Sequence, residues 1–152
     1  ARSIRRATAE DAATVGALTR AAYAKWVPII HREPKPMTAD PHAAIRDHQV
    51  DLLHLAGALA ALIETIPHDD HLLIENIAVD PAHQHRGLGR QLLAHAEQLA
   101  AAQGHKTIRL YTNKAFAANV LLYLKFGYTI DREEDSHLGT TVYMSKPLVP
   151  GR

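Results

Sequence analysis

The sequence contains no cysteine among its 152 residues. This absence excludes disulfide bonds, thiolate ligands for zinc and a cysteine nucleophile, and it favours an intracellular protein. The chain also has no large excess of positive or negative charge, because it contains 17 Lys and Arg residues and 16 Asp and Glu residues. A chain so close to neutral has no broad basic field, so no nucleic-acid partner is expected.

Long hydrophobic runs are missing as well. No stretch of about eighteen apolar residues occurs, and the first residues hold no continuous apolar segment of the signal-peptide type. The sequence therefore predicts a cytoplasmic protein without a membrane partner. With 47% apolar and 22% charged residues, it has the composition of a globular protein. Its length fits one domain covering residues 1–152.

Hydrophobic periodicity predicts a mixed α/β chain. Thr8 with Asp11 three residues later has the pattern of a capping box, so a helix is expected from there to about Lys25. Asp40 followed by Pro41 predicts a second, short helix, whereas the prolines between residues 27 and 37 predict a loop. The other expected elements are a strand at 3–7, three strands between 50 and 80, a helix from 88 to 103, a strand at 106–113, a helix at 115–126, and closing strands at 127–131 and 139–146.

The junction between the third of these strands and the next helix carries a candidate binding site. In the stretch AVDPAHQHRGLGRQLL, residues 78 to 93, Gly87 and Gly89 stand where a helix begins. The first N–H groups of a helix lack partners, so glycines there let an anion approach, and Arg86 and Arg90 supply charge. The same spacing also suits a plain turn. A third glycine or a following Gly-Lys-Ser/Thr would indicate the common nucleotide-binding loops, and neither is present.

Gln84, Gly87 and Gly89 match the pattern Gln/Arg-x-x-Gly-x-Gly/Ala, and the segments ENIAVDP and LYLKFGY lie before and after it. In this order they resemble the acetyl-CoA signature and flanking motifs of the GNAT superfamily of N-acetyltransferases. The resemblance implies an α/β fold with a central, twisted, mostly antiparallel sheet of about seven strands and about four flanking helices. It also implies that the fourth and fifth strands, near 71–79 and 106–112, splay apart to admit the pantetheine arm of acetyl-CoA.

The resemblance also assigns residues to the coenzyme. Backbone groups of residues 77 to 79 would pair with the pantetheine arm, and the loop before the helix would hold the pyrophosphate. The coenzyme-binding residues expected from the resemblance are Ile77, Ala78, Val79, Gln84, His85, Arg86, Gly87, Leu88, Gly89, Arg90 and Asn119.

One position departs from the family pattern. Many members place an asparagine seven residues before the tyrosine that corresponds to Tyr123, and this chain has Phe116 there. Asn119 and Asn113 are the nearby replacements. An asparagine at a helix or strand end is often a cap, so the sequence does not choose between them.

The activity implied by the resemblance is transfer of an acetyl group from acetyl-CoA to a primary amine, by direct attack in a ternary complex. Acetyl-CoA is then a cosubstrate. The sequence does not identify the acceptor, which is a small-molecule or peptide amine, and it leaves a homodimer open. The alternative function is a noncatalytic acyl-CoA-binding or regulatory domain, which would bind the coenzyme and turn over nothing.

Two residues are candidates for proton transfer. Glu75 lies two residues before Ile77 on the predicted strand, on the same side, and is the candidate base. Bound water is the other candidate, and Glu75 is equally well explained as a solvent-facing strand residue. Tyr123 stands where the family commonly has a tyrosine acting as general acid. A phenol can fill this role because it stays protonated at neutral pH. A core tyrosine that only packs its ring is the alternative.

The proline-bearing loop is the candidate acceptor side. Arg32 and Glu33 would recognise a carboxylate and an amine, while Tyr23 and Trp26 would form an apolar wall. Trp26 could equally anchor the loop to the core. Eleven histidines and the run HDDH at 68–71 raise the question of a metal, but a polar turn explains that run, so no metal is expected.

Overall fold

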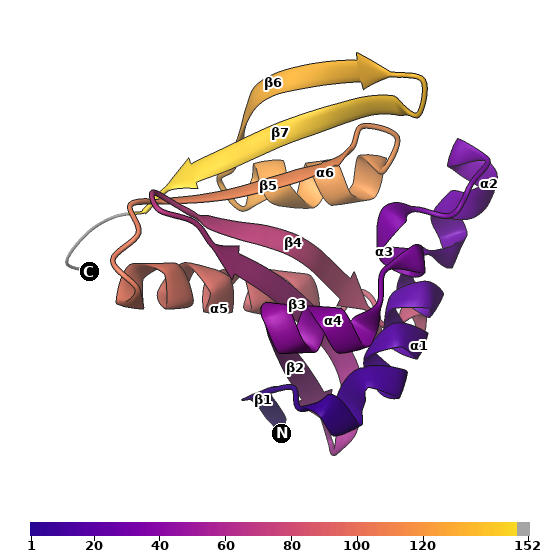
Figure 1. Cartoon of the computed structure of the whole chain (residues 1–152), viewed down its shortest axis with the longest axis vertical. Coiled ribbons are helices and arrows are strands. Elements are labelled where there is room, and N and C mark those ends of the chain that lie inside the picture. The colour runs from indigo at the N-terminus through magenta and orange to yellow at the C-terminus, as the bar shows by residue number, and fades with distance from the viewer. Residues whose placement is uncertain (149–152) are drawn as a thin grey trace. The chain divides into compact units, whose positions relative to one another are not determined.

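The computed structural model describes residues 1–148 of the chain. Its α-helices and β-strands are labelled in chain order in Figure 1. The strands are β1 (Arg2–Arg6), β2 (Gln49–Leu55), β3 (Ala58–Pro67), β4 (Leu72–Val79), β5 (Thr107–Asn113), β6 (Thr129–Ser136) and β7 (Gly139–Pro147). The helices are η1 (Ala9–Asp11), α1 (Ala12–Tyr23), η2 (Ala24–Trp26), α2 (Val27–Ile30), α3 (Lys35–Thr38), α4 (Pro41–Asp47), η3 (Pro81–His83), α5 (Leu88–Ala102) and α6 (Ala117–Lys125).

The seven strands follow the order β1-β2-β3-β4-β5-β7-β6. Pairs β1/β2, β2/β3, β5/β7 and β6/β7 are antiparallel, and β4/β5 is parallel. This confirms the predicted α/β fold with a mixed, mostly antiparallel sheet. The parallel register joins Leu72–Ile74 to Ile108–Leu110, although β4 extends to Val79 and β5 to Asn113. The predicted parting of the two strands concerns the residues beyond this register.

The chain divides into two compact units, and the divisions between them fall inside β3, β4 and α5. The first unit comprises residues 1–65 and 76–92, and the second comprises residues 66–75 and those from Leu93 onward. The first unit buries Leu52, Leu53, Leu62, Ile63, Leu88 and Leu92. The second buries Leu93, Ile108, Tyr128 and Met144. A single domain over residues 1–152 stays a prediction.

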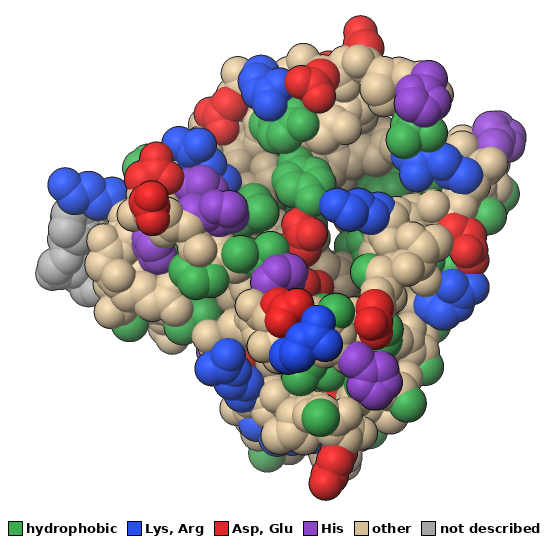
Figure 2. Space-filling view, in the orientation of Figure 1, with side chains coloured by type: hydrophobic (Ala, Val, Ile, Leu, Met, Phe, Trp, Pro, Cys, Tyr) green, Lys and Arg blue, Asp and Glu red, His purple; other side chains and the backbone are tan. Residues whose placement is uncertain are grey.

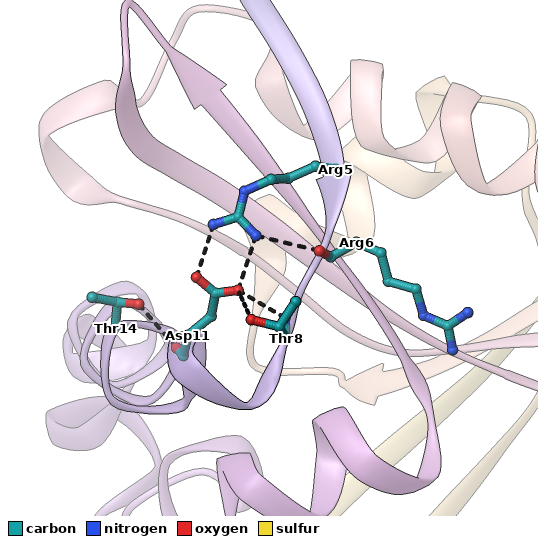
Figure 3. Close-up of polar contacts among 5 residues, drawn as sticks. All are labelled: Arg5, Arg6, Thr8, Asp11 and Thr14. Atoms are coloured by element: carbon teal, nitrogen blue, oxygen red, sulfur yellow. Dashed lines mark hydrogen bonds and ion pairs between the residues drawn. The ribbon is translucent and has the colours of Figure 1, made fainter.

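The capping box predicted before the first helix is present. The Thr8 N–H donates to Oδ2 of Asp11 over 2.8 Å, and two guanidinium nitrogens of Arg5 donate to both carboxylate oxygens of Asp11 (Figure 3). These hydrogen bonds, first from Arg5 and then from Thr8, hold the pKa of Asp11 far below its usual range. The side chain of Arg6 points away from this cluster in the same view. The first helical segment is therefore fastened to β1 through the side chain of Arg5.

The structure departs from the sequence prediction in two segments. Residues 27–37 were expected to form a loop, but they contain the short helices α2 and α3. Pro28 and Pro36 occupy the first turn of each helix, where a proline has no N–H bond to lose. Strand β6 runs to Ser136, beyond the expected end at residue 131. Because every residue of β6 is exposed, its sequence has no apolar alternation to mark its length.

Charge on the surface is mixed. On the face drawn in Figure 2, Lys and Arg side chains are interspersed with Asp and Glu side chains. This distribution agrees with the near-neutral composition of the sequence. Within residues 1–148, no helix is long and apolar enough to cross a membrane.

Candidate functional site

The loop between β4 and α5 has a specific backbone shape. Asp80 accepts a hydrogen bond from the Ala82 N–H over 3.0 Å and so caps η3. Beyond η3, His85 has φ of 65° and Gly87 has φ of 74°, which places both in the left-handed region. Glycine adopts this region freely, whereas a histidine there costs about 1 kcal/mol or more. Strain of this kind is often found where a loop binds a ligand.

The amides that follow are free donors. The Gln91 N–H donates to the Gly87 carbonyl over 3.1 Å, which is the first hydrogen bond of α5. Within residues 1–148, the backbone N–H groups of residues 87 to 90 donate to no acceptor. The start of α4 differs, because there Asp40 accepts a hydrogen bond from the His42 N–H. Gly87 has no side chain with which to cap its own helix, so the amino end of α5 is open to an anion.

Space and charge at this helix end also suit an anion. A Cβ added to Gly87 would meet no atom of the described residues within 4 Å. His85, Arg86 and Arg90 are exposed, and within the described residues the two guanidinium groups form no ion pair. Unpaired guanidinium groups beside a helix amino end attract phosphate groups through charge and forked hydrogen bonds. We refer to residues 84–90 as the anion cradle.

Arg2 contacts the residues on either side of the four free amides, Arg86 and Gln91. Its Nη2 donates to the Arg86 carbonyl over 2.7 Å, and its Nη1 donates to Oε1 of Gln91 over 2.9 Å. Sequence reasoning missed this residue. The two partners lie more than eighty positions away along the chain, and no local motif links them.

On β4, burial alternates along the part expected to meet the coenzyme. Asn76 and Ala78 are buried, while Ile77 and Val79 are half-buried. The hydroxyl of Tyr23 lies 2.8 Å from Oδ1 of Asn76 and 3.2 Å from the Ile77 carbonyl, and it donates to these oxygens. Tyr23 is thus attached to β4 by its polar end, an arrangement that the sequence did not reveal.

The residues predicted for the acceptor side have partners of their own. Trp26 is buried, and the Lys25 ammonium lies 5.1 Å from its ring centre. Glu33 forms an ion pair of 2.7 Å with Arg20, whose other nitrogen donates to the Met37 carbonyl. The roles of Tyr23, Trp26, Arg32 and Glu33 in acceptor binding stay predictions.

In the second unit, Glu75 is half-buried on β4. Its Oε1 accepts a hydrogen bond of 2.8 Å from the hydroxyl of Tyr111 on the parallel neighbour β5. Tyr111 was not among the residues predicted from the sequence. The signal was available in the alternation of β5, which can direct Tyr111 to the same face as Glu75.

Tyr123 lies on α6 with only 5% of its surface exposed. Its ring meets the Tyr128 ring edge to face, with 6.2 Å between ring centres. Burial raises the pKa of Tyr123 above its ordinary value, so the phenol keeps its proton throughout the neutral range. A buried phenol of this kind can act as a proton donor.

The two candidate asparagines differ in their partners. Oδ1 of Asn113 accepts a hydrogen bond of 2.9 Å from the Ala115 N–H, so this side chain caps the turn before α6. The side chain of Asn119 is half-buried and forms no hydrogen bond within residues 1–148. Phe116, at the family's asparagine position, is buried. Asn119 is therefore the side chain left available to a ligand.

The HDDH run forms a turn with its own contacts. Nδ1 of His71 lies 2.7 Å from Oδ1 of Asp70, and the rings of His68 and His71 stack. The hydrogen bond from His71 lowers the pKa of Asp70. Across the described part of the chain, no three His, Asp or Glu side chains are grouped as metal ligands would be.

Comparison with known proteins gives related sequences. Residues 18–128 match the acetyltransferase (GNAT) family. The ribosomal protein bS18-alanine N-acetyltransferase of Escherichia coli strain K12 is 38% identical over 72 residues, which are 47% of this chain and 49% of that protein. Its counterpart from Salmonella typhimurium strain LT2 is 41% identical over 59 residues, which are 39% of this chain and 40% of that protein. The match thus spans about half the length of these curated relatives or less.

Solved structures share the fold. The Escherichia coli ribosomal-protein-S18-alanine N-acetyltransferase superposes with a TM-score of 0.76 and 22% identity, covering 100% of this chain and 97% of that chain. The PaiA N-acetyltransferase of Thermoplasma acidophilum, crystallised with coenzyme A, gives a TM-score of 0.73 and 20% identity, covering 97% of this chain and 99% of that chain. Because the family match covers most of the chain, this protein belongs to the GNAT acetyltransferase family.

Proposed function

We propose that this protein transfers an acetyl group from acetyl-CoA to a primary amine by direct attack. The observation that carries the proposal is the anion cradle, where four consecutive amides, residues 87 to 90, have no acceptor within residues 1–148. Arg86 and Arg90 stand beside these amides and form no ion pair with any other described residue. A pyrophosphate would accept hydrogen bonds from such amides and gain from both guanidinium groups.

Other residues would hold the rest of the coenzyme. Backbone groups of Ile77, Ala78 and Val79 would pair with the pantetheine arm as a neighbouring strand does, which requires no particular side chain there. Asn119 would contact the coenzyme from α6, because Asn113 is engaged as a turn cap. Coenzyme A in the Thermoplasma acidophilum relative supports this class of ligand.

The chemistry needs one base and one acid. An alkylammonium has a pKa of about 10.4 and attacks a thioester only after losing a proton. Glu75 would accept that proton, directly or through water. The amine nitrogen then forms a bond to the acetyl carbon, the carbon–sulfur bond breaks, and Tyr123 would give its proton to the departing thiolate. The nitrogen loses its remaining extra proton, which would restore the Tyr123 phenol directly or through water. A phenol held protonated by burial suits this last step.

The acceptor is a primary amine on a peptide or a small molecule. The Escherichia coli relative is named for the alanine of a ribosomal protein, so a peptide with an amino-terminal alanine is the first acceptor to test. A cytoplasmic setting is proposed with it, since a chain without cysteine fits a reducing compartment.

Calorimetric titration with acetyl-CoA tests the coenzyme site. The variant is Gly87→Glu, whose carboxylate would repel pyrophosphate, and the matched control is Gly57→Glu. Gly57 has φ of 83° and, like Gly87, has no atom of residues 1–148 within 4 Å of an added Cβ. Both variants therefore carry the same backbone strain. Saturable binding by the wild type and the control, lost in Gly87→Glu, supports the proposal, whereas no binding by the wild type would refute it.

Turnover separates an enzyme from a binding domain. Release of free thiol from acetyl-CoA would be followed with a panel of amines, beginning with an alanine peptide. Amine-dependent release supports the transferase. Tight coenzyme binding without release for any amine would favour the noncatalytic acyl-CoA-binding domain instead.

A further inference from the structure

We propose that Arg2 is a positioning residue for the pyrophosphate of the coenzyme, which it orients by fixing the backbone of the anion cradle. The proposal rests on the proposed function. One guanidinium donates to the Arg86 carbonyl at 2.7 Å and to the Gln91 side chain at 2.9 Å. It therefore fastens both ends of the segment that carries the four free amides.

The contact at Arg86 sets the direction of one of these amides. The Arg86 carbonyl and the Gly87 N–H belong to the same peptide unit, which is planar and trans, so they point in opposite directions. With the carbonyl held toward Arg2, the Gly87 N–H points away from β1. This N–H has no acceptor within residues 1–148.

The peptide unit held by Arg2 lies next to His85, the strained residue of the loop. His85 and Gly87, on either side of Arg86, both have left-handed φ values. A left-handed conformation at histidine persists only where surrounding contacts maintain it. The hydrogen bond from Arg2 to the Arg86 carbonyl is such a contact, and no other hydrogen bond to this carbonyl is formed in the described part of the chain.

Strand alternation explains why Arg2 reaches this loop. Successive side chains of a strand point to opposite faces, so Arg2 shares a face with Arg6 and not with Arg5. Arg5 binds Asp11 at the start of the first helical segment, while Arg2 binds the start of α5. Strand β1 thus supports two helix starts in the first unit, one on each face.

A positioning role differs from a simple charge effect. Arg2→Lys keeps the positive charge but replaces the planar fork, which serves two acceptors, with a flexible point charge. If Arg2 acts by holding the backbone, lysine does not replace it. If Arg2 acts only through its electric field, lysine restores binding.

The test is calorimetric titration of the whole chain with coenzyme A. Arg2→Ala is expected to raise the Kd about three- to tenfold, and Arg2→Lys should stay close to Arg2→Ala. Gln91→Ala removes one of the two contacts and should raise the Kd by a smaller factor. If Arg2→Ala does not fold, Gln91→Ala takes its place in the test. Arg6→Ala is the matched control, because this exposed arginine shares the strand and the face of Arg2, and its side chain has no hydrogen bond within residues 1–148.

A second readout separates positioning from general stability. Acetylpantetheine carries the thioester but no pyrophosphate, so Arg2→Ala should raise the KM for acetyl-CoA and leave the KM for acetylpantetheine and kcat unchanged. Wild-type affinity in Arg2→Ala or in Arg2→Lys would overturn the inference and leave the proposed function standing. Absence of coenzyme binding by the wild type would overturn both.

Discussion

The phenolic hydroxyl of Tyr111 donates a hydrogen bond of 2.8 Å to the carboxylate of Glu75. The two residues lie on β5 and β4, whose parallel register ends one residue before each of them, at Leu110 and Ile74. A carboxylate held by one donor keeps its second oxygen for another partner. In the proposed mechanism, where Glu75 is the base, Tyr111 would orient its carboxylate.

Substitution of Glu75 by Gln tests the base. The amide cannot accept the proton of the amine, so kcat should fall about 100-fold or more while the KM for acetyl-CoA stays the same. Tyr111→Phe removes only the hydrogen bond and should lower kcat about two- to tenfold. Tyr143→Phe is the matched control, because its ring lies 6.0 Å from the Tyr111 ring on β7. A kcat unchanged in Glu75→Gln would leave water as the base.

The pair Tyr123 and Tyr128 offers a test of the acid. Tyr123→Phe keeps the ring that packs against Tyr128 but removes the proton donor, so kcat should fall about 100-fold with little change in stability. Since burial raises the pKa of Tyr123, ionisation of this phenol should cause no loss of kcat/KM in the wild type up to about pH 10. A pH profile of both proteins provides the measurement.

Tyr128→Phe is the control for that experiment. The Tyr128 hydroxyl is buried and has no hydrogen-bond partner within residues 1–148. Its removal should leave kcat unchanged and leave the free energy of unfolding equal or higher by up to about 1 kcal/mol. An equal loss of kcat in both variants would show that Tyr123 acts through packing alone.

The sequence was most informative where a feature is local. The capping box at Thr8 and Asp11 and the cap at Asp40 each depend on residues within a few positions, and both are present. The glycine pair likewise marks a strand-to-helix junction. The backbone at Gly87 has a left-handed φ, and glycine adopts this conformation without strain. Such signals need no knowledge of the rest of the fold.

Features that depend on distant residues were not predicted. The contact of Arg2 with Arg86 requires β1 and the start of α5 to lie close together. The hydrophobic pattern of the sequence does not predict that proximity. Glu33 was predicted from the sequence to bind the acceptor amine, but its carboxylate forms an ion pair with Arg20. Tertiary packing decides which polar side chains remain available to bind a ligand. The sequence therefore yields more candidate binding residues than the fold leaves without protein partners.

Alanine substitution at Gly87 separates backbone strain from ligand binding. Both Gly87→Ala and Gly57→Ala place a Cβ in open space at a left-handed φ, so each should lower the free energy of unfolding by about 1 kcal/mol. Only Gly87→Ala should also weaken coenzyme binding, because the added methyl lies beside the free amides. Urea unfolding and calorimetry provide the two measurements. Equal affinity in both variants would contradict the anion cradle.

The Asp11 carboxylate predicts a pH dependence of stability. Asp11→Ala removes the hydrogen-bond acceptor of the Thr8 N–H and the contacts with Arg5. The free energy of unfolding at pH 7 should therefore fall by about 1–2 kcal/mol. Because the folded pKa of Asp11 is lowered, its contribution is complete above the unfolded pKa of about 3.9 and declines as the pH falls toward the folded value. The difference between wild type and variant should therefore be constant from pH 7 to about pH 5 and shrink below about pH 4. Asp47→Ala removes an exposed ion pair with Arg46 and should have a smaller effect. Urea unfolding of the three proteins across this pH range measures the differences, and a gap that widens on acidification would contradict the assignment.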